Sequence, residues 1–189
     1  MQDVLGSGAT QKTDDKVSNM AEKTGGTTTL GNASGVVTNA NGIQIVSYRG
    51  EENPFGNIWK FVDGINVMAN GIHSAYVADH DFNDKQSTNN YTDVGFTLAK
   101  KRGQVSAFGY SQDFDWLFLT SETEGNSSVP VGDFFWQNYT ATDVGGWRSV
   151  TLGACWNDYV NAGCFAWFVE NSTGVRLRTM STRLVYLGG

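Results

Sequence analysis

Hydrophobic positions divide the chain near residue 42. All of the aromatic residues lie after this point, from Tyr48 to Tyr186, whereas the first segment carries only scattered apolar residues. Residues 25–35 are mainly turn formers and the stretch before them is polar and charged, so we expect residues 1–42 to form an extended arm. Two alternatives stay open: a disordered leader, or a segment that becomes ordered against copies of itself or a larger assembly. The apolar residues that favour the second are Val4, Leu5, Val17, Met20, Leu30, Val36 and Val37.

The pattern after the arm predicts a strand and then a short amphipathic helix. Residues 42–48 alternate well enough to be a strand. Asn53 has a side chain suited to capping a helix, Pro54 suits the first helical position, and Gly64 is the expected end. Between them, apolar residues recur at spacings of three and four, which is typical of a helix that buries one face. These residues are Ile58, Phe61, Val62 and Ile65.

The rest of the chain predicts short strands joined by polar loops. Strands are expected at residues 91–98, 104–110, 148–152 and 164–169, and aromatic runs occur at 114–118 and 133–136. No long helical pattern is found. Residues 43–189 are therefore expected to form one α+β domain, with one or two helices and a curled antiparallel sheet.

Composition favours a compact, turn-rich domain. Charged residues make up 17% of the chain and aromatic residues 13%, with 23 glycines and 2 prolines. The formal net charge of -6 argues against a nucleic-acid partner, because proteins that follow phosphate backbones need a basic stripe. The longest apolar stretches fall far short of the roughly 20 residues that cross a bilayer, so no membrane insertion is expected.

The chain start and the cysteines bear on where the protein is made. Residues 1–5 lack the basic and apolar regions of a secretory signal, so we expect synthesis in a cytoplasm without export by that route. The spacing of Cys155 and Cys164 fits neither a paired metal-ligand motif nor a disulfide framework. Two reduced, packed thiols are expected.

Residues for catalysis are not indicated. A reactive thiol needs electropositive, partly exposed surroundings, whereas the charges nearest to the two cysteines are Asp158 and Glu170. No G-x-S-x-G motif is present. A glycosidase needs two carboxylates at a fixed separation, which a sequence does not show. Candidates by residue type alone are Asp113, Asp115, Glu122, Glu124 and Asp133. We therefore predict a protein that is not an enzyme and has no cofactor.

A metal site near the two histidines is the weaker of two alternatives. His73 and His80 have Asp79, Asp81 and Asp84 close by in the sequence, and such residues bind zinc or a harder ion when a loop brings them together. The stretch lacks the ligand spacing and central glycine of an EF-hand loop. The favoured alternative is a solvated polar loop without metal.

The candidate binding surface lies in residues 150–178, where aromatic side chains are mixed with polar ones. Rings offer much contact area for little lost rotamer entropy, and polar neighbours fix the orientation of a ligand. The predicted ligand-binding residues are Trp156, Asn157, Asp158, Tyr159, Trp167, Phe168, Glu170, Arg176 and Arg178. For Trp156, Phe165 and Trp167 the alternative is a place in the core, because a strand at 164–169 buries at least one face.

Three blocks of the sequence resemble the C-type-lectin fold of formylglycine-generating-enzyme-like proteins and of the variable proteins of diversity-generating retroelements. Residues 56–61 (GNIWKF) are similar to the G-N-V-W-E-W of that family. Residues 147–157 (WRSVTLGACWN) look like its R-x-x-x-G-G-S-W element, with Ala154 and Cys155 in place of Gly and Ser. Residues 181–185 (STRLV) are similar to its G-F-R-L-V ending.

More specifically, four segments together resemble a group of phage and prophage structural proteins. They are residues 48–59, 114–118, 130–133 and 161–165. The resemblance covers about residues 43–189 and implies a C-type-lectin-like domain that binds a host-surface receptor, either a glycan or a protein. In retroelement-diversified relatives the residues that vary lie in the stretch corresponding to 150–178.

The resemblance further implies a place on a virion, as a fibre or surface protein. Residues 1–42 would join other virion proteins or sister subunits, and by analogy with phage fibres a homotrimer is expected. One alternative is a capsid decoration or head-fibre protein without a host ligand. Another is an oxidase of the formylglycine-generating type, which the placement of Cys155 and Cys164 disfavours.

Overall fold

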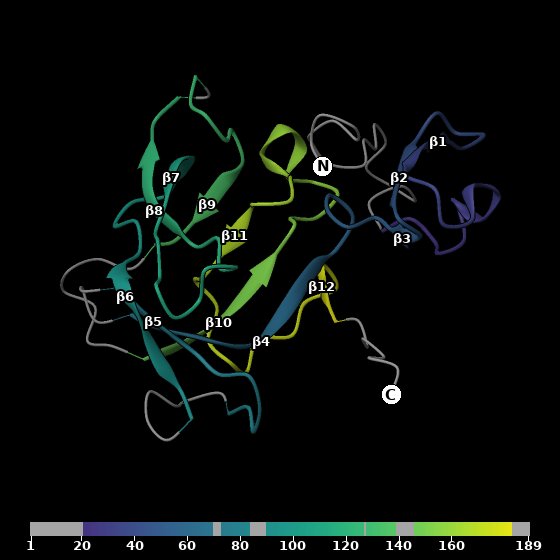
Figure 1. The fold of residues 1–189 in the computed structure, drawn as a ribbon. Helices are drawn as coiled ribbons and strands as arrows, with labels where there is room; N and C mark the ends of the chain where they lie inside the picture. The colour runs from purple at the N-terminus through teal and green to yellow at the C-terminus, as the bar shows by residue number, and fades with distance from the viewer. Residues whose placement is uncertain (1–20, 70–72, 84–89, 127, 139–145, 183–189) are drawn as a thin grey trace.

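The computed structural model of the chain describes residues 21–69, 73–83, 90–126, 128–138 and 146–182 (Figure 1). It is 40% strand and 4% helix. The α+β class expected from the sequence, with the short helices of a C-type-lectin-like domain, is therefore wrong: the protein is nearly all β. The expectation of a curled antiparallel sheet is confirmed, because the main sheet curls into a half-barrel.

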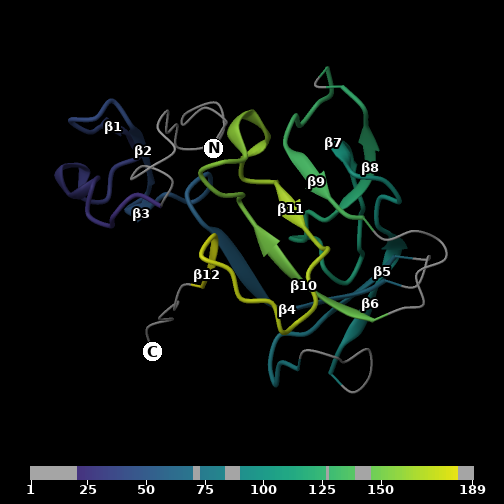
Figure 2. The same cartoon turned by 180° about the vertical axis from the view of Figure 1, so that it is seen from behind.

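The strands form a small sheet and a large one, which lie side by side in both views (Figures 1 and 2). The small sheet has the order β1 (Gly35–Thr38), β2 (Gln44–Tyr48), β3 (Glu51–Glu52). The large sheet has the order β6 (Thr92–Thr97), β5 (Ser74–Val77), β4 (Trp59–Met68), β10 (Trp147–Leu152), β11 (Trp167–Phe168), β9 (Phe134–Trp136), β7 (Gly103–Phe108), β8 (Thr120–Glu124), and β12 (Met180–Ser181) also pairs with β4. The described helical turns are η1 (Thr28–Leu30) and η2 (Tyr159–Asn161).

The segment predicted as a helix is the long central strand β4. Asn53 adopts a positive φ of 49° and its amide donates to Val46 O, so this residue closes a turn against β2 and caps no helix. The spacing of three and four has another cause. Val62 pairs with Val150 and Asn66 with Ser149, so the register shifts and residues 63–65 form a bulge. A bulge resets the alternation of a strand and thereby imitates a helical spacing.

Gly64 lies within this bulge, at a φ of +79°. A Cβ atom on Gly64 would collide with Ala78 O and the ring of Phe82. Glycine is needed here because β4 bends while β5 packs closely against it. The residue expected to end a helix thus allows a strand to curl.

The predicted strands at 42–48, 91–98, 104–110 and 148–152 are confirmed as β2, β6, β7 and β10, and β11 lies within the stretch 164–169. The large sheet almost closes on itself, since Ala99, just beyond β6, donates its amide hydrogen to Thr120 O at the start of β8 (3.0 Å). Its interior holds the main hydrophobic core. The largest fully buried apolar side chains there are Phe135, Leu98, Leu119, Val67, Val94, Val105, Val150 and Val169.

A second apolar cluster is built around Trp59. The ring of Trp59 lies 5.1 Å from that of Trp136 and 5.4 Å from that of Phe168, both in edge-to-face geometry. Such pairs add about 0.5–1.5 kcal/mol beyond the burial of their area. Trp156 is buried in the same cluster. The GNIWKF block thus supplies a core residue of a β-sheet.

Part of the expected arm belongs to the small sheet. The proposed boundary at residue 42 falls in the turn between β1 and β2, where Asn39 Oδ1 accepts the amide hydrogens of Asn41 and Ile43. Asn57 also holds residue 22 to the large sheet: its side chain accepts from Glu22 N and donates to Glu22 O. Residues 1–20, in which the other half of the arm was expected, lie outside the described residues. No helix in the part described is long and apolar enough to cross a membrane.

Candidate binding surface

The nine residues predicted to bind a ligand are divided between the interior and the surface. Trp156 and Trp167 are buried, with 4% and 6% of their surface exposed. Asp158, Phe168 and Glu170 are half-buried, and Asn157, Tyr159, Arg176 and Arg178 are exposed. The alternative for Trp156 and Trp167, a place in the core, is therefore the one that the structure shows.

Trp167 is buried because its side chain packs into the main hydrophobic core. It pairs with Leu152 of β10 and with Phe135 of β9, and its indole Nε1 donates a hydrogen bond to Phe118 O (2.8 Å). A buried indole needs such an acceptor, and here the acceptor is a backbone carbonyl of another loop. Trp167 therefore holds the backbone at Phe118 in place, but its own ring is not exposed to a ligand.

Asn157 and Asp158 are engaged in a local turn. Asp158 Oδ2 accepts the backbone amide hydrogen of Cys155 (2.8 Å), and Cys155 Sγ lies 2.7 Å from Asn157 Oδ1. This turn leads into η2, where Tyr159 adopts a positive φ of 51° with 62% of its surface exposed. Asn157 and Asp158, which were expected to contact a ligand, thus stabilise this turn. Tyr159 is the aromatic side chain that the loop exposes to solvent.

The described residues contain a larger group of exposed rings, at the connection between β7 and β8. We name it the ring surface and define it as Phe108, Tyr110, Phe114, Trp116, Phe118 and Phe165. Of these, Tyr110 is 75% exposed, Trp116 57% and Phe118 49%, and the other three are half-buried. Exposed apolar side chains that gather in one patch often mark a binding site, whereas singly scattered ones do not.

Contacts between rings form two groups within this surface, one of three rings and one of two. The centroids of Phe108, Phe118 and Phe165 lie 5.2–5.8 Å apart in all three pairings, and Phe114 lies 6.1 Å from Trp116. Phe165 joins the ring surface to the loop of η2, because the same loop carries Tyr159 at its other end. Asn161, between them, accepts a hydrogen bond from Gln104 Nε2 of β7 (3.1 Å).

A buried carboxylate fixes the position of Phe165. Asp133 is 1% exposed, and its Oδ2 accepts the amide hydrogen of Phe165 (2.6 Å). The backbone of Gly163 packs so closely on this carboxylate that a Cβ atom there would overlap it. On the other side, Leu117 and Leu119 are buried in the main core and anchor the residues between which Phe118 is displayed. The ring surface therefore has a rigid base.

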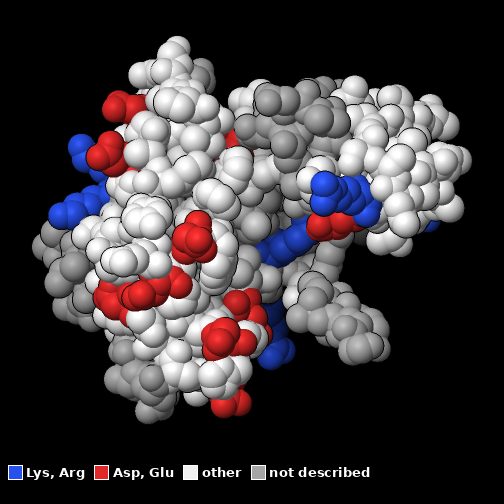
Figure 3. Space-filling model, viewed as in Figure 1, with Lys and Arg blue, Asp and Glu red and all other residues white. Residues whose placement is uncertain are grey.

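Acidic side chains accompany the ring surface. Asp113 and Asp115 are exposed and flank Phe114 in the sequence. Figure 3 shows acidic side chains spread over the large-sheet side of this face, with basic ones at its margin and in the hollow beside the small sheet. On the face drawn in Figure 3, the exposed charges over the large sheet are therefore mainly negative.

The hollow beside the small sheet has a volume of about 190 Å³ and is lined by polar groups that hold the two sheets together. Lys60 Nζ donates to the carbonyl oxygens of Asn53 and Pro54. Glu52 accepts hydrogen bonds from the backbone amides of Gly25 and Thr27. Lys60 therefore ties β4 of the large sheet to the connection after β3, and Glu52 ties residues 25–27 to the small sheet.

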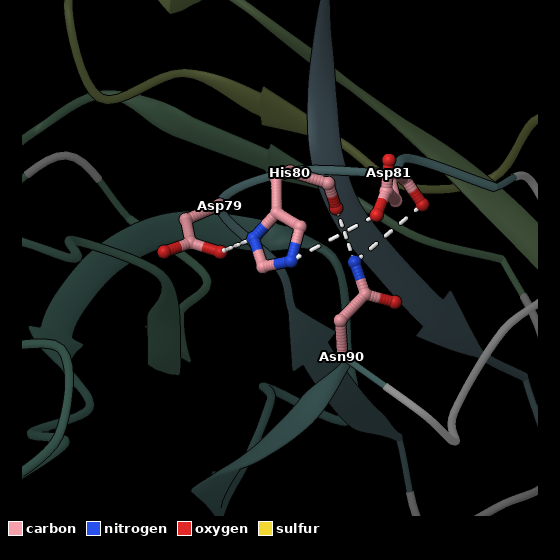
Figure 4. Close-up of polar contacts among 4 residues, drawn as sticks. All are labelled: Asp79, His80, Asp81 and Asn90. Carbon is pink, nitrogen blue, oxygen red and sulfur yellow. Dashed lines mark hydrogen bonds and ion pairs between the residues drawn. The ribbon is translucent and has the colours of Figure 1, made fainter.

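The histidines do not gather a metal-binding set among the described residues. His73 is buried, whereas His80 is exposed, and its ring lies between the carboxylates of Asp79 and Asp81 (Figure 4). Nδ1 of His80 meets Asp79 Oδ1, and Nε2 lies 3.9 Å from Asp81 Oδ2. The hydrogen bond to His80 lowers the pKa of Asp79. No group of three or more metal-binding side chains is found in the described part, and Asp84 lies outside it.

The two thiols are free, and neither is set up as a nucleophile. Burial raises the pKa of Cys155 far above its ordinary value, and Asp158 raises it further. Burial, followed by the charge of Asp133, raises the pKa of Cys164 to about 11. Both thiols are therefore protonated at neutral pH, whereas the thiolate is the form that attacks or binds metal.

The ring surface was missed as a site although its sequence holds a signal. In residues 114–119 every second residue is aromatic, and Leu117 and Leu119 lie between or beside the rings. Leu117 and Leu119 are buried in the main core, and Phe118 between them is exposed. A segment that is apolar on both sides leaves one apolar side exposed to solvent unless a second element of the protein or a ligand covers it.

A search of protein-family models, curated proteins and solved structures finds no match to this chain.

Proposed function

We propose that this chain is a non-enzymatic attachment protein, a virion surface or fibre component that binds a host-surface receptor through the ring surface. The observation that carries the proposal is the exposure of Tyr110, Trp116 and Phe118 on a base held by core contacts. Rigid rings bind with a small loss of conformational entropy, so they suit a recognition surface.

The chemistry of the described residues supports binding over catalysis. Both cysteines are protonated at neutral pH, and the ring surface lacks a nucleophile beside a base. The oxidase alternative needs a reactive thiol, and burial works against one here.

The placement on a virion follows from the sequence resemblance. Many copies on one particle would gain avidity through effective concentration, so each contact need not be tight. Residues 1–42 would serve the assembly, with a homotrimer as the proposed state. Within them, Thr27 donates its amide hydrogen to Glu52 of β3, and Glu22 donates its amide hydrogen to Asn57, just before β4.

The test is attachment of the fluorescent full-length chain to washed cells of a panel of bacteria. We expect saturable attachment to a subset of strains, and a loss of tenfold or more with Trp116→Ala. The matched control is Leu177→Ala, which also removes an exposed apolar side chain (53% exposed) but lies outside the ring surface. Attachment to no strain, or equal attachment of both variants, would refute the proposal and favour a decoration protein without host ligand.

A further inference from the structure

The charge of the segment around the ring surface restricts the ligand. From Gly103 to Trp147 the sequence has no Lys, Arg or His, and it has six acidic residues. The five that the structure describes are Asp113, Asp115, Glu122, Glu124 and Asp133, and the sixth, Asp143, lies outside the described residues. A ligand with many negative charges would meet the exposed carboxylates of Asp113 and Asp115 beside the rings, and this segment supplies no cation to offset the repulsion.

We infer that the ring surface binds a carbohydrate without negative charge, either neutral or carrying amino groups. Aromatic faces are electron-rich, and the axial C–H groups of a pyranose ring present positive edges that stack on them. Carboxylates accept hydrogen bonds from sugar hydroxyls, and charge-assisted bonds of this kind are the stronger ones. Asp113 and Asp115, beside Phe114 and Trp116, supply such acceptors at the rings.

The size of the surface fits a short glycan better than a protein. An aromatic side chain buries about 150–250 Å² when fully covered, so three half-exposed rings offer on the order of 300 Å². A stable protein interface needs about 800 Å² from each partner. Tyr110, Trp116 and Phe118 therefore match two or three sugar units.

The loop at residues 114–118 is held in one conformation by hydrogen bonds within the protein, so a ligand need not order it. Trp167 Nε1 holds the carbonyl of Phe118, and Leu117 N donates to Phe114 O (3.0 Å), which closes the turn that carries Trp116. A weakly charged sugar contributes little electrostatic energy, so a preformed surface matters more for it than for a charged ligand.

This inference rests on the proposed function, and its test separates the two. The full-length chain is applied to immobilised oligosaccharides of three kinds: neutral (mannan and chitotetraose), amino-bearing (chitosan oligomers) and acidic (alginate and heparin). We expect binding to at least one neutral or amino-bearing glycan and to neither acidic one.

Trp116→Ala should lower this binding tenfold or more and Leu177→Ala less than twofold. Asp113→Asn with Asp115→Asn should lower it about threefold to tenfold. Binding to neutral glycans should change less than twofold between 50 and 500 mM NaCl, because ions screen only charged contacts.

Three outcomes would overturn the inference: retention of acidic glycans alone, no glycan retained, or equal binding by Trp116→Ala. If cells are still bound in a Trp116-dependent manner while every glycan fails, the proposed function stands with a protein receptor. If Trp116→Ala leaves cell attachment unchanged as well, both are refuted.

Discussion

Two aromatic-rich regions, residues 108–118 and residues 150–178, differ in whether their tryptophans are exposed or buried. In the second, Trp156 and Trp167 are buried, although the sequence around them has the mixture of rings and polar groups found at binding surfaces. In the first, Trp116 and Phe118 remain exposed, although no ligand-binding residue was predicted there.

The difference lies in whether the side chains of each segment pack into the core. Trp167 of β11 packs into the main core inside the curled sheet. Residues 109–119 connect β7 to β8, the last strand of the sheet, so one side of the connection faces solvent. Ring content therefore does not reveal exposure, which depends on whether a side chain points into the core or away from it.

The largest expected effect contrasts the two tryptophans. Trp167→Ala should destabilise the protein by about 3–5 kcal/mol, because it removes a core ring and leaves a cavity. Trp116→Ala should change the free energy of unfolding by less than about 0.5 kcal/mol, since the side chain is mostly in water. Urea unfolding followed by far-UV circular dichroism measures both, and similar losses would erase the contrast.

The next effect tests the support beneath Phe165. Gly163→Ala should cost about 1–3 kcal/mol, because a Cβ atom would overlap the carboxylate of Asp133. Gly174→Ala is the matched control, since a Cβ there meets nothing within 4 Å. Thermal unfolding of the two variants measures this difference. Equal melting temperatures would mean that the 163–165 loop is not packed on Asp133.

A smaller effect concerns charge in the second region. Burial raises the pKa of Glu170, whose Oε1 has no hydrogen-bond partner among the described residues. The folded state therefore holds the proton more tightly than the unfolded state does, and this contribution to stability is complete below the unfolded pKa and declines as the pH rises through the folded one.

Glu170→Gln should accordingly raise the melting temperature at pH 7, with the gain vanishing below about pH 4. Glu124→Gln, at an exposed carboxylate of β8, is the control and should show little change at either pH. A gain for Glu170→Gln that is the same at pH 7 and at pH 3 would mean that ionisation is not its cause.

The smallest effect asks whether exposed residues of the second region also contact the ligand. Arg176→Ala with Arg178→Ala should change binding to a neutral glycan less than twofold, because the inferred contacts lie on the ring surface. Glycan binding and melting temperature are measured together. A tenfold loss with unchanged stability would move the contact to residues 150–178.

Several strands and the curled sheet were predictable from the sequence because alternation is a local property. The strands β2, β6, β7 and β10 match the predicted segments closely. The helix at 53–64 was wrong for a reason that is not local: the bulge at residues 63–65 depends on how β10 pairs with β4. Without that pairing, a spacing of three and four predicts a helix.

The candidate site was less predictable, for a related reason. The sequence by itself determined that the domain is rich in rings and that its middle carries acids without bases. Only the tertiary structure decided that Trp167 faces inward and Trp116 outward, because exposure depends on whether a side chain points into the core. A side chain is buried by the residues that pack against it, and in this sheet the strands that lie beside one another are mostly distant in the sequence.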